Sequence, residues 1–550
     1  MSNKNWKSIS NLKEPFNDAV NYRSKGEKEF FNKIFLKTED LKRCLSPSIY
    51  FLIGEKGVGK TAYAVYLENN AVEDSRCKLV TMTETQYKRF IELKKKGQLS
   101  YSDYANIWRS MLLFMVSQVV VEKSKSFLHT FTGKFKKIED VVKKWNSTAL
   151  NPEVESAFEA IRSDSLYGKV SNKNIDVGGK LEVKDTEKTS FIKHHLLETE
   201  SALKEALADL KLSADHVLFI DGIDFRPESV PYADYLECIK GLGEAVWQLN
   251  ADFFQGIKDS KGRIKIVLLV RPDIFHALNL YNSNSRMQDN CVFLDWSTTE
   301  RDIDTSRLYQ ASGLYFASQQ SFPAENSESW KHYFHSMSSS QKDQPLQRIL
   351  KHSFQKPRDV FTAIKLLRNL KIKRGKGDQN FFEFSLLKDA NFTRDYSDYL
   401  LGEVRNFAAF YMTQDDFSRY LKFFQYLNGK SEFEMTDFEQ AHKQFVEWAK
   451  GEEFKATNYL RDSQALLQFF YDVNVIGYRE VTNDNSEMFY HWSFKERSLN
   501  NIAPKVKVAS TLMLNPGIAK ALDIGKSVAH TSSPMSPRKR TKREKHIRGR

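Results

Sequence analysis

Five short apolar segments stand out along the first half of the chain. They are mostly apolar, and the segment 264–270 (IKIVLLV) is almost entirely apolar. Continuous apolar runs of this length are typical of parallel strands that helices cover on both sides. The sequence therefore predicts an α/β fold with a parallel five-stranded sheet, whose strands lie at 48–53, 78–82, 216–220, 264–270 and 291–296.

A helical period separates the last strands of this set. Apolar residues recur every three or four positions between Tyr232 and about Phe254, which predicts an amphipathic helix packed on the sheet. The residues of this apolar stripe are Tyr235, Ile239, Leu242, Val246, Leu249 and Phe253.

Changes in pattern divide the 550 residues into successive parts. Residues 1–45 predict a helical lead-in and residues 46–300 a core that contains the sheet. An insertion occupies about 83–212, because far more chain lies there than one helix and one strand require. Its pattern predicts helices at 101–122, 152–161 and 196–210 and a small hairpin at 175–183, with His194 and His195 facing solvent.

The second half of the chain is mainly helical. Residues 301–382 predict a helical lid. Residues 383–526 combine aromatic-rich helices, the first at 403–411, with a ribbon formed by 475–481 and 488–494. Helices followed by a ribbon predict an α-rich, winged-helix-like C-terminal region, which either docks DNA or packs against the core.

One motif follows the first predicted strand directly. The run GEKGVGKT fits G-x-x-x-x-G-K-[ST] and leads into helix-favouring residues, so strand, glycine-rich loop and helix occur in the order that a phosphate-binding loop requires. Backbone N–H groups of such a loop surround a polyphosphate, the lysine contacts the β- and γ-phosphates, and the hydroxyl binds Mg²⁺. The predicted nucleotide-binding residues are Gly54, Glu55, Lys56, Gly57, Val58, Gly59, Lys60, Thr61 and Ala62, with Lys60 also catalytic and Thr61 also a metal ligand.

A carboxylate at the end of a neighbouring strand is the second requirement of a Mg²⁺-nucleotide site. The run HVLFI ends in Asp221, and we expect Asp221 to hold the metal through water. Asp224 is placed to orient or deprotonate the attacking water. The alternative is that Asp221 is a turn residue or helix cap after a core strand.

Two arginines complete the predicted catalytic set. Arg271 follows the strand 264–270, on the edge where α/β sheets bind ligands, so it is predicted to contact the γ-phosphate. A structural ion pair is the alternative for Arg271. Pro357 favours the first turn of a helix, which places Arg358 at a helix N-terminus from which it can reach the nucleotide. The alternative for Arg358 is an ordinary surface position.

These segments resemble a known group of enzymes. IYFLIGEKGVGKT together with VLFIDGID resembles the additional-strand class of P-loop ATPases, the Asp-Gly-x-Asp form is similar to that of NACHT and KAP members of the STAND group, and KPRD resembles the second-sensor segment of AAA+ and STAND lids. DAVNYRSKGEKEFFNKIF and the stretch from FIDGIDFRPESV to VLLVRPDIF resemble bacterial FunZ-type P-loop ATPases.

The resemblance implies a particular arrangement. The strand before Lys60 and the strand ending at Asp221 would flank a central strand ending at Arg271, followed by a helical lid and a winged-helix-like region. Arg271 would take the first-sensor position and Arg358 the second. Phe225 stands where NACHT proteins often have a second acidic residue, and Gly222 where many AAA+ enzymes have the catalytic glutamate.

Composition and charge narrow the class of protein. With 41% hydrophobic and 28% charged residues the chain can bury a core, which excludes wholesale disorder. The longest dense apolar run, 111–121, is about half the length of a membrane span, and no secretory signal pattern begins the sequence. Four cysteines lie far apart without CxxC spacing, so we expect a cytoplasmic protein without disulfides or zinc.

The net charge of +13 is unevenly distributed. The last residues, 538–550, hold eight Lys and Arg and one Glu, and they follow a Ser/Pro-rich stretch. Residues 527–550 therefore predict a disordered basic tail that either attracts nucleic acid or another acidic partner or only solubilises the chain.

The sequence favours a cytoplasmic ATPase that binds ATP and Mg²⁺ and acts as a nucleotide-driven conformational switch. The resemblance adds a role in bacterial defence or stress response. The alternatives are a DNA-associated AAA+-like motor or loader, a low-turnover ATP-gated binding module, suggested by Gly222 and Phe225, and a small-molecule kinase. Homo-oligomers, nucleic acid and a protein are the candidate partners besides ATP, and no membrane is expected.

Deletion of residues 538–550 tests the role of the tail. If the tail is an electrostatic anchor, its loss should weaken binding to double-stranded DNA by at least about tenfold at low salt and flatten the salt dependence. Fluorescence anisotropy with labelled DNA across a salt series measures both quantities. An identical binding curve at low salt would assign the tail a solubilising role.

Overall fold

The computed structural model describes residues 4–83, 87, 91, 103–123, 200–280 except 202, 283–299, 301–334, 344–482 and 487–522. The predicted helix 152–161, the hairpin 175–183, His194, His195 and the basic tail 527–550 lie outside the described residues. Of the predicted helix 196–210, residues 200–201 and 203–208 are helical.

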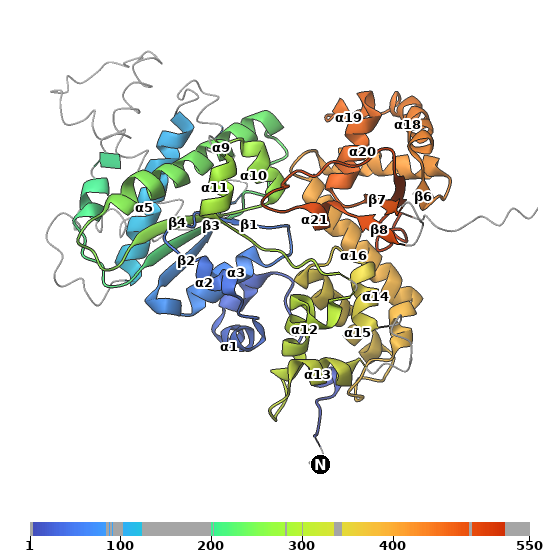
Figure 1. The fold of residues 1–550 in the computed structure, drawn as a ribbon, viewed down its shortest axis with the longest axis horizontal. Coiled ribbons are helices and arrows are strands. Elements are labelled where there is room, and N and C mark those ends of the chain that lie inside the picture. Colours follow the sequence, from blue (N-terminus) through green and yellow to red (C-terminus); the bar gives the residue numbers. More distant parts are fainter. Residues whose placement is uncertain are drawn as a thin grey trace, which may run out of the picture.

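A five-stranded, all-parallel sheet forms the centre of the first part of the chain (Figure 1). Its order is β2-β3-β4-β1-β5, so β4 lies between β1 and β3 as the resemblance implies. Ile53 of β1 pairs with Val270 of β4, and Thr81 of β2 pairs with Asp221 of β3. The predicted α/β fold and parallel sheet are confirmed, with strands β1 Phe51–Ile53, β2 Arg76–Thr81, β3 His216–Asp221, β4 Ile264–Val270 and β5 Cys291–Phe293.

Alternate residues of the buried strands face two separate cores. Leu52, Phe219 and Leu269 pack on one side, in a core shared with the N-terminal and lid helices. Ile53 and Leu268 pack on the opposite side, in a core formed with the helices that follow β3 and β4. The first face is covered by α1 Lys25–Ile34 and α3 Lys60–Asn69, and the second by α5 Asp103–Lys123, α9 Tyr232–Gln248, α10 Pro272–Leu278 and α11 Ser283–Asn290 (Figure 1).

Helix α9 has the predicted amphipathic stripe. Tyr235, Ile239, Leu242 and Val246 are fully buried. The α-helix ends at Gln248, and a π-helical turn, η6 Leu249–Phe253, and a 3-10 turn, η7 Phe254–Gly256, carry the chain to the predicted end.

Helix α5 is a long apolar helix of the core. By length and composition its segment Tyr104–Glu122 could cross a membrane, but 78% of that stretch is buried inside the protein. It packs against α9 and β3, as a core helix does. The prediction of a helix at 101–122 is confirmed.

The N-terminal segment runs from the lid to the core. Ile9 and Ser10 donate backbone hydrogen bonds to Gln379 and Gly377, beyond the last lid helix. The N-terminal elements are η1 Ile9–Asn11, η2 Ala19–Arg23, α1 and α2 Glu39–Arg43, and η3 Val72–Asp74 follows α3. The lid contains η8 Ile303–Thr305, α12 Arg307–Ala317, α13 Asn326–Tyr333, α14 Pro345–Lys351 and α15 Pro357–Lys373.

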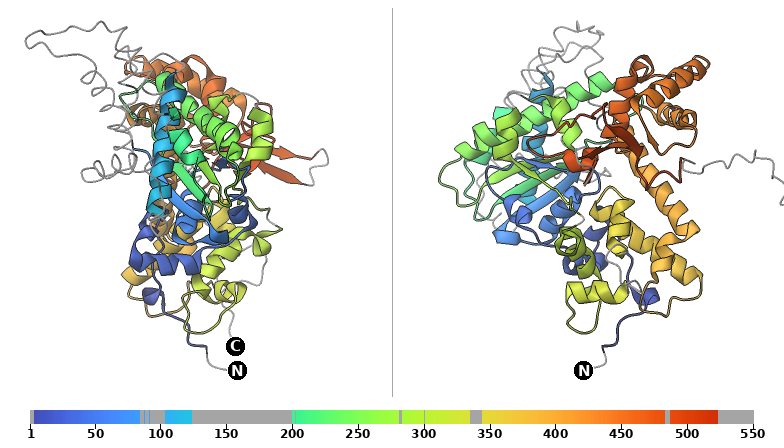
Figure 2. Two further views of the ribbon diagram at one scale, coloured as in Figure 1. Left: turned by 90° about the vertical axis from the view of Figure 1, so that its left-hand side faces the viewer. Right: turned by 45° about the vertical axis from the view of Figure 1, so that its right-hand side comes forward.

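Helix α16, Ala390–Ala408, leads from the lid to the C-terminal part (Figure 2, right). It begins well before the predicted start at Glu403, and its buried residues Phe392, Tyr396, Leu400 and Val404 recur every four positions, a helical period that the prediction left out. The elements around it are η10 Phe384–Lys388 before it and α17 Gln414–Tyr420, η11 Leu421–Leu427, α18 Met435–Ala449, α19 Asn458–Arg461 and α20 Ser463–Asp472 after it.

The predicted ribbon is an antiparallel pair of strands, β7 Ile476–Val481 and β8 Met488–His491. It belongs to a four-stranded sheet of order β6-β9-β7-β8 that the sequence analysis did not predict. The added strands are β6 Glu432–Phe433, which has two residues, and β9 Thr511–Leu514, which pairs with β7 from beyond α21 Ser493–Glu496. Such short strands paired across long connections leave no local pattern.

Candidate nucleotide-binding site

The loop 54–59 connects β1 to α3 at the carboxyl edge of the sheet. Gly59 has φ +100°, a left-handed conformation that side-chain-bearing residues avoid, and it caps the start of α3. Helix α3 begins at Lys60, so its first backbone N–H groups and the positive end of its dipole face the loop. A cavity of about 450 Å³ opens there, and loop residues from Lys56 to Ala62 line it.

Lys60 is buried and holds the loop together. Its ammonium donates to the carbonyl oxygens of Gly54 at 2.8 Å and Glu55 at 3.2 Å. Burial lowers the pKa of Lys60, while Asp224 and Asp221 act to raise it. The lysine is therefore positioned by the loop backbone and lies within the field of both acids.

Asp221 and Thr61 meet at the cavity, although 160 residues separate them in sequence. The Thr61 hydroxyl donates to Asp221 Oδ2 at 2.6 Å, and the backbone N–H of Gly222 donates to Asp221 Oδ1 at 2.8 Å. Burial raises the pKa of Asp221, opposed by the hydrogen bond from Thr61. The hydroxyl and carboxylate that were predicted as metal ligands thus lie in direct contact.

Asp224, three residues after Asp221, also lines the cavity. Its Oδ1 atom is buried and has no hydrogen-bond partner among the residues that the structure describes. An unsatisfied buried carboxylate oxygen at a cavity wall is suited to accept a hydrogen bond from a bound water or ligand.

Arg271 lies beside the site and is fully buried. Its guanidinium forms a bidentate pair with Asp273 at 3.0 and 2.6 Å and stacks 3.8 Å from the ring centroid of Phe407 in α16. Tyr411 donates to the same carboxylate at 2.5 Å, and Arg271 lowers the pKa of Asp273 to about 2 against the effect of burial. The observed contacts are those of a structural ion pair, and a γ-phosphate contact would require that pair to rearrange.

Arg358 lies at the N-terminus of α15 and lines the cavity. Its guanidinium pairs with Glu403 of α16 at 3.0 Å, and its backbone N–H lies 3.4 Å from the carbonyl oxygen of Gly57. The expected position at a helix start is therefore present, and it brings α15 against the glycine-rich loop.

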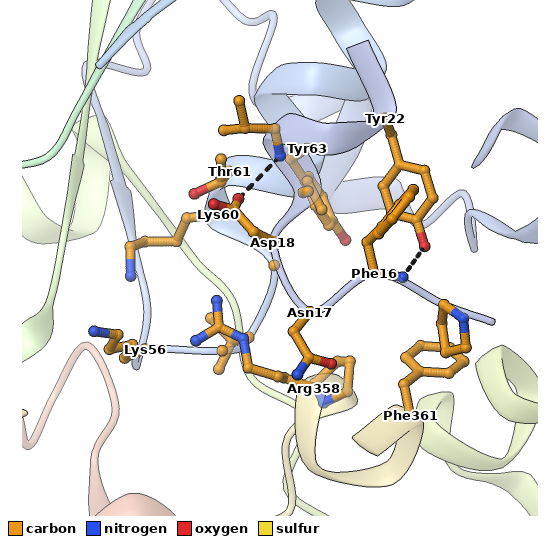
Figure 3. Close-up of a pocket in the computed structure, with 18 of the residues that line it drawn as sticks. Phe16, Asn17, Asp18, Tyr22, Lys56, Lys60, Thr61, Tyr63, Arg358 and Phe361 are labelled. Carbon is orange, nitrogen blue, oxygen red and sulfur yellow. Dashed lines mark hydrogen bonds between the residues drawn. The ribbon is translucent and has the colours of Figure 1, made fainter. Parts of the chain in front are cut away.

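Aromatic residues from the N-terminal segment and the lid form the far wall of the cavity. Figure 3 shows Phe16, Tyr22 and Phe361 on one side and Lys56, Lys60 and Thr61 on the other, with Arg358 between them. The hydroxyl of Tyr22 accepts a hydrogen bond from the backbone of Phe16 at 2.7 Å, which fixes this segment. One end of the cavity is thus apolar, and the other carries charged groups of both signs.

Glu55 links the loop to the C-terminal part. Its carboxylate forms a buried ion pair with Arg497, which follows α21, and lies 3.7 Å from Lys356 at the start of α15. Burial acts to raise the pKa of Glu55, but Arg497 and Lys356 outweigh it and lower that pKa. Arg497 also lies 3.5 Å from Asp472 of α20.

Several of these residues are not among those predicted from the sequence. Glu55 and Arg497 are 442 positions apart, so no spacing connects them. The side chain of Arg497 is 2% exposed and belongs to the contact with the loop. For Tyr22 a signal existed, because it lies in the N-terminal stretch 18–35, one of the segments that carry the resemblance, whereas Phe16 lies outside that stretch.

No protein-family model matches the chain, and no curated protein matches it either. Within the described ranges, no group of three or more His, Cys, Asp or Glu side chains is arranged to hold a metal ion. A cation at Asp221 and Thr61 would therefore need oxygen ligands from a bound phosphate and water.

Gly222→Ala tests the geometry behind Asp221. Gly222 has φ +92°, and an added Cβ would lie 2.3 Å from the carbonyl oxygen of Met82, so we expect a loss of about 3 kcal/mol or more in the free energy of unfolding. Urea unfolding measures it.

Gly402→Ala is the matched control. Gly402 lies within α16 with no atom near the added Cβ, so this change should be neutral or stabilise by up to about 1 kcal/mol. Equal stability of the two variants would contradict the close packing of Gly222 against Met82.

Proposed function

We propose that the chain is a Mg²⁺-dependent P-loop ATPase of the additional-strand class. The observation that carries this proposal is the 2.6 Å contact between Thr61 and Asp221 beside the glycine-rich loop, in one cavity with Lys60. The strand order supports it, because β4 lies between the strand before the loop and the strand that ends in Asp221. FunZ-type ATPases are the group that the sequence resembles, and membership in that group is part of the proposal.

The residues present fit a magnesium ion. Thr61 Oγ1 and the Asp221 carboxylate would hold it, since hydroxyl and carboxylate oxygens are the ligands that Mg²⁺ takes beside phosphate oxygens and water. When bound, the ion would neutralise phosphate charge and polarise the γ-phosphate.

The cavity suits a purine nucleoside triphosphate. Its volume of about 450 Å³ lies within the range of small-molecule sites. The aromatic wall of Phe16, Tyr22 and Phe361 would bury the base, and the backbone N–H groups at the start of α3 would bind the phosphates. ATP is the nucleotide that we propose, because no guanine-reading NKxD-type segment follows the last strand.

Asp224 is the proposed general base. Its unpartnered Oδ1 would accept a proton from a water that attacks the γ-phosphorus while the bond to the β–γ bridging oxygen breaks and leaves its electron pair on ADP. Gly222 does not supply an acid, and its backbone has no room for a side chain beside Met82. Asp224 is therefore the acid on which turnover should depend.

The contacts of Glu55 support a switch. Through Arg497 and Lys356, one loop carboxylate joins the core, the lid and the C-terminal part. A ligand that shifts the loop backbone would change the geometry of this buried pair, and buried pairs tolerate little displacement. We propose that nucleotide binding is transmitted along this path.

The alternative of a DNA-associated motor draws less support from the described residues. Arg497 is buried, and Arg479 of the ribbon pairs with Glu432 at 3.1 Å. The basic tail remains the feature that favours it.

Lys60→Ala and Asp224→Asn test the ATPase proposal. Lys60→Ala should remove ATP binding, because the loop loses both its cation and the bonds to Gly54 and Glu55. Asp224→Asn should keep ATP affinity within about threefold and lower kcat by about 10²-fold or more. Phosphate release and ATP titration measure these effects, and unchanged affinity and turnover in Lys60→Ala would refute the site.

Arg497→Ala and Glu55→Gln test the switch. In the wild type, ATP should slow hydrogen exchange of the backbone in residues 493–497, and either change should abolish that response because the buried pair is broken. The free energy of unfolding should fall less in the double variant than the sum of its falls in the two single variants, and the difference should be about 1–3 kcal/mol.

Arg479→Ala is the matched control for the switch. It removes an arginine of the same region whose ion pair with Glu432 is partly exposed, so the response to ATP should persist. If Arg497→Ala also responds to ATP like the wild type, the proposed path is wrong.

A further inference from the structure

Lys56 is a loop lysine that lines the cavity together with Lys60 and Arg358 (Figure 3). Its ammonium lies 4.8 Å from the ring centroid of Phe225, the residue after Asp224. Burial lowers the pKa of Lys56, while Glu403 and Asp224 act to raise it. The side chain thus stands at the charged end of the cavity, between the loop and the acids.

The other cations of this region have polar or acidic partners. Lys60 donates to the carbonyl oxygens of Gly54 and Glu55. Arg358 pairs with Glu403, Arg271 with Asp273, and Arg497 with Glu55. Among the residues that the structure describes, Lys56 is the cation lining the cavity that has neither a carboxylate within 4.0 Å nor a hydrogen-bond acceptor; its contact is the ring of Phe225.

A cation over an aromatic ring is held weakly. Such a contact at a partly exposed site contributes about 0.5–1 kcal/mol, and Phe225 is 47% exposed. The ring positions the ammonium without neutralising it, so Lys56 can turn to an anion in the cavity at little cost.

The electrostatic neighbours of Lys56 indicate which end of a nucleotide it would meet. Lys56 and Lys60 both interact with Asp224, the acid proposed to activate water. The aromatic wall formed by Phe16 and Tyr22 belongs to the other end of the cavity (Figure 3). The ammonium of Lys56 therefore lies on the γ-phosphate side.

We propose that Lys56 is a further catalytic residue, whose ammonium leaves the ring of Phe225 and contacts the γ-phosphoryl oxygens of the bound nucleoside triphosphate. This inference rests on the proposed function. Water oxygen bonds to the γ-phosphorus, the bond to the bridging oxygen breaks with its electron pair on ADP, and the water proton passes through Asp224 to solvent. Lys56 forms no covalent bond and transfers no proton; its charge stabilises the developing negative charge. In some ATPases and GTPases an arginine from a second protein stabilises this charge; here a lysine of the loop would do so.

Lys56→Met, Lys56→Arg and Phe225→Asp test this role by steady-state phosphate release and ATP titration. Lys56→Met should lower kcat by about 10²–10³-fold while the Kd for ATP changes by less than about tenfold. Lys56→Arg should restore most of kcat. Phe225→Asp should also lower kcat, because the new carboxylate holds the ammonium away from the phosphate. In the wild type, kcat should not depend on protein concentration.

Lys422→Met is the matched control, because Lys422 lies over Trp448 at 5.8 Å in the C-terminal part. It should leave kcat unchanged. Unchanged kcat in Lys56→Met, or a loss confined to Kd, would overturn the proposal.

A second measurement separates this proposal from the ATPase itself. If turnover is too slow to follow, the affinity for ADP with aluminium fluoride, which mimics the transferring phosphoryl group, should fall about 10²-fold in Lys56→Met while the affinity for ADP alone stays within about threefold. An equal loss of affinity for both ligands would overturn the role of Lys56 and leave the ATPase proposal standing. A wild type that binds no nucleotide overturns the proposed function, and this inference with it.

Discussion

Desolvation of charge at the carboxyl edge of the parallel sheet constrains the arrangement of the whole chain. Charged groups brought out of water must find partners, since an unpaired buried charge costs several kcal/mol. Glu55 of the loop is compensated by Arg497 and Lys356, and Arg271 by Asp273. These partners come from the core, the lid and the C-terminal part, so pairing the charges also fixes how the parts pack.

The same constraint explains the two ends of the cavity. Lys60 and Asp221 are buried where their charges are screened poorly, and burial lowers the pKa of one and raises that of the other. Each shift opposes the charged form, and a bound anion would favour the charged form of Lys60 as a bound cation would favour that of Asp221. The aromatic wall carries no charge that needs a partner, and it can exclude water from a flat apolar ligand. The proposed ligand, a nucleoside triphosphate, combines an anionic part with a flat base.

Much of the core could be predicted from the sequence, because its signals are local. A buried parallel strand is an apolar run of several residues, and the loop requires glycine, lysine and threonine at fixed spacing. β1, β3 and β4 and the stripe of α9 were recognised in this way. Arg271 shows the limit of such reasoning: its place after β4 was correct, but its partner Asp273 and its stacking on Phe407 of α16 depend on packing.

The sequence by itself determined the parallel sheet and the candidate residues Lys60, Thr61, Asp221 and Asp224. Strand ends and loop motifs consist of consecutive residues, so they can be recognised locally. Tertiary structure alone decided that Arg497 pairs with Glu55, that Phe16 and Tyr22 form a cavity wall, and that β9 joins β7. It also decided that Lys56 faces a ring instead of a carboxylate. The physical reason is that burial and charge pairing depend on distances in space between residues that are far apart along the chain.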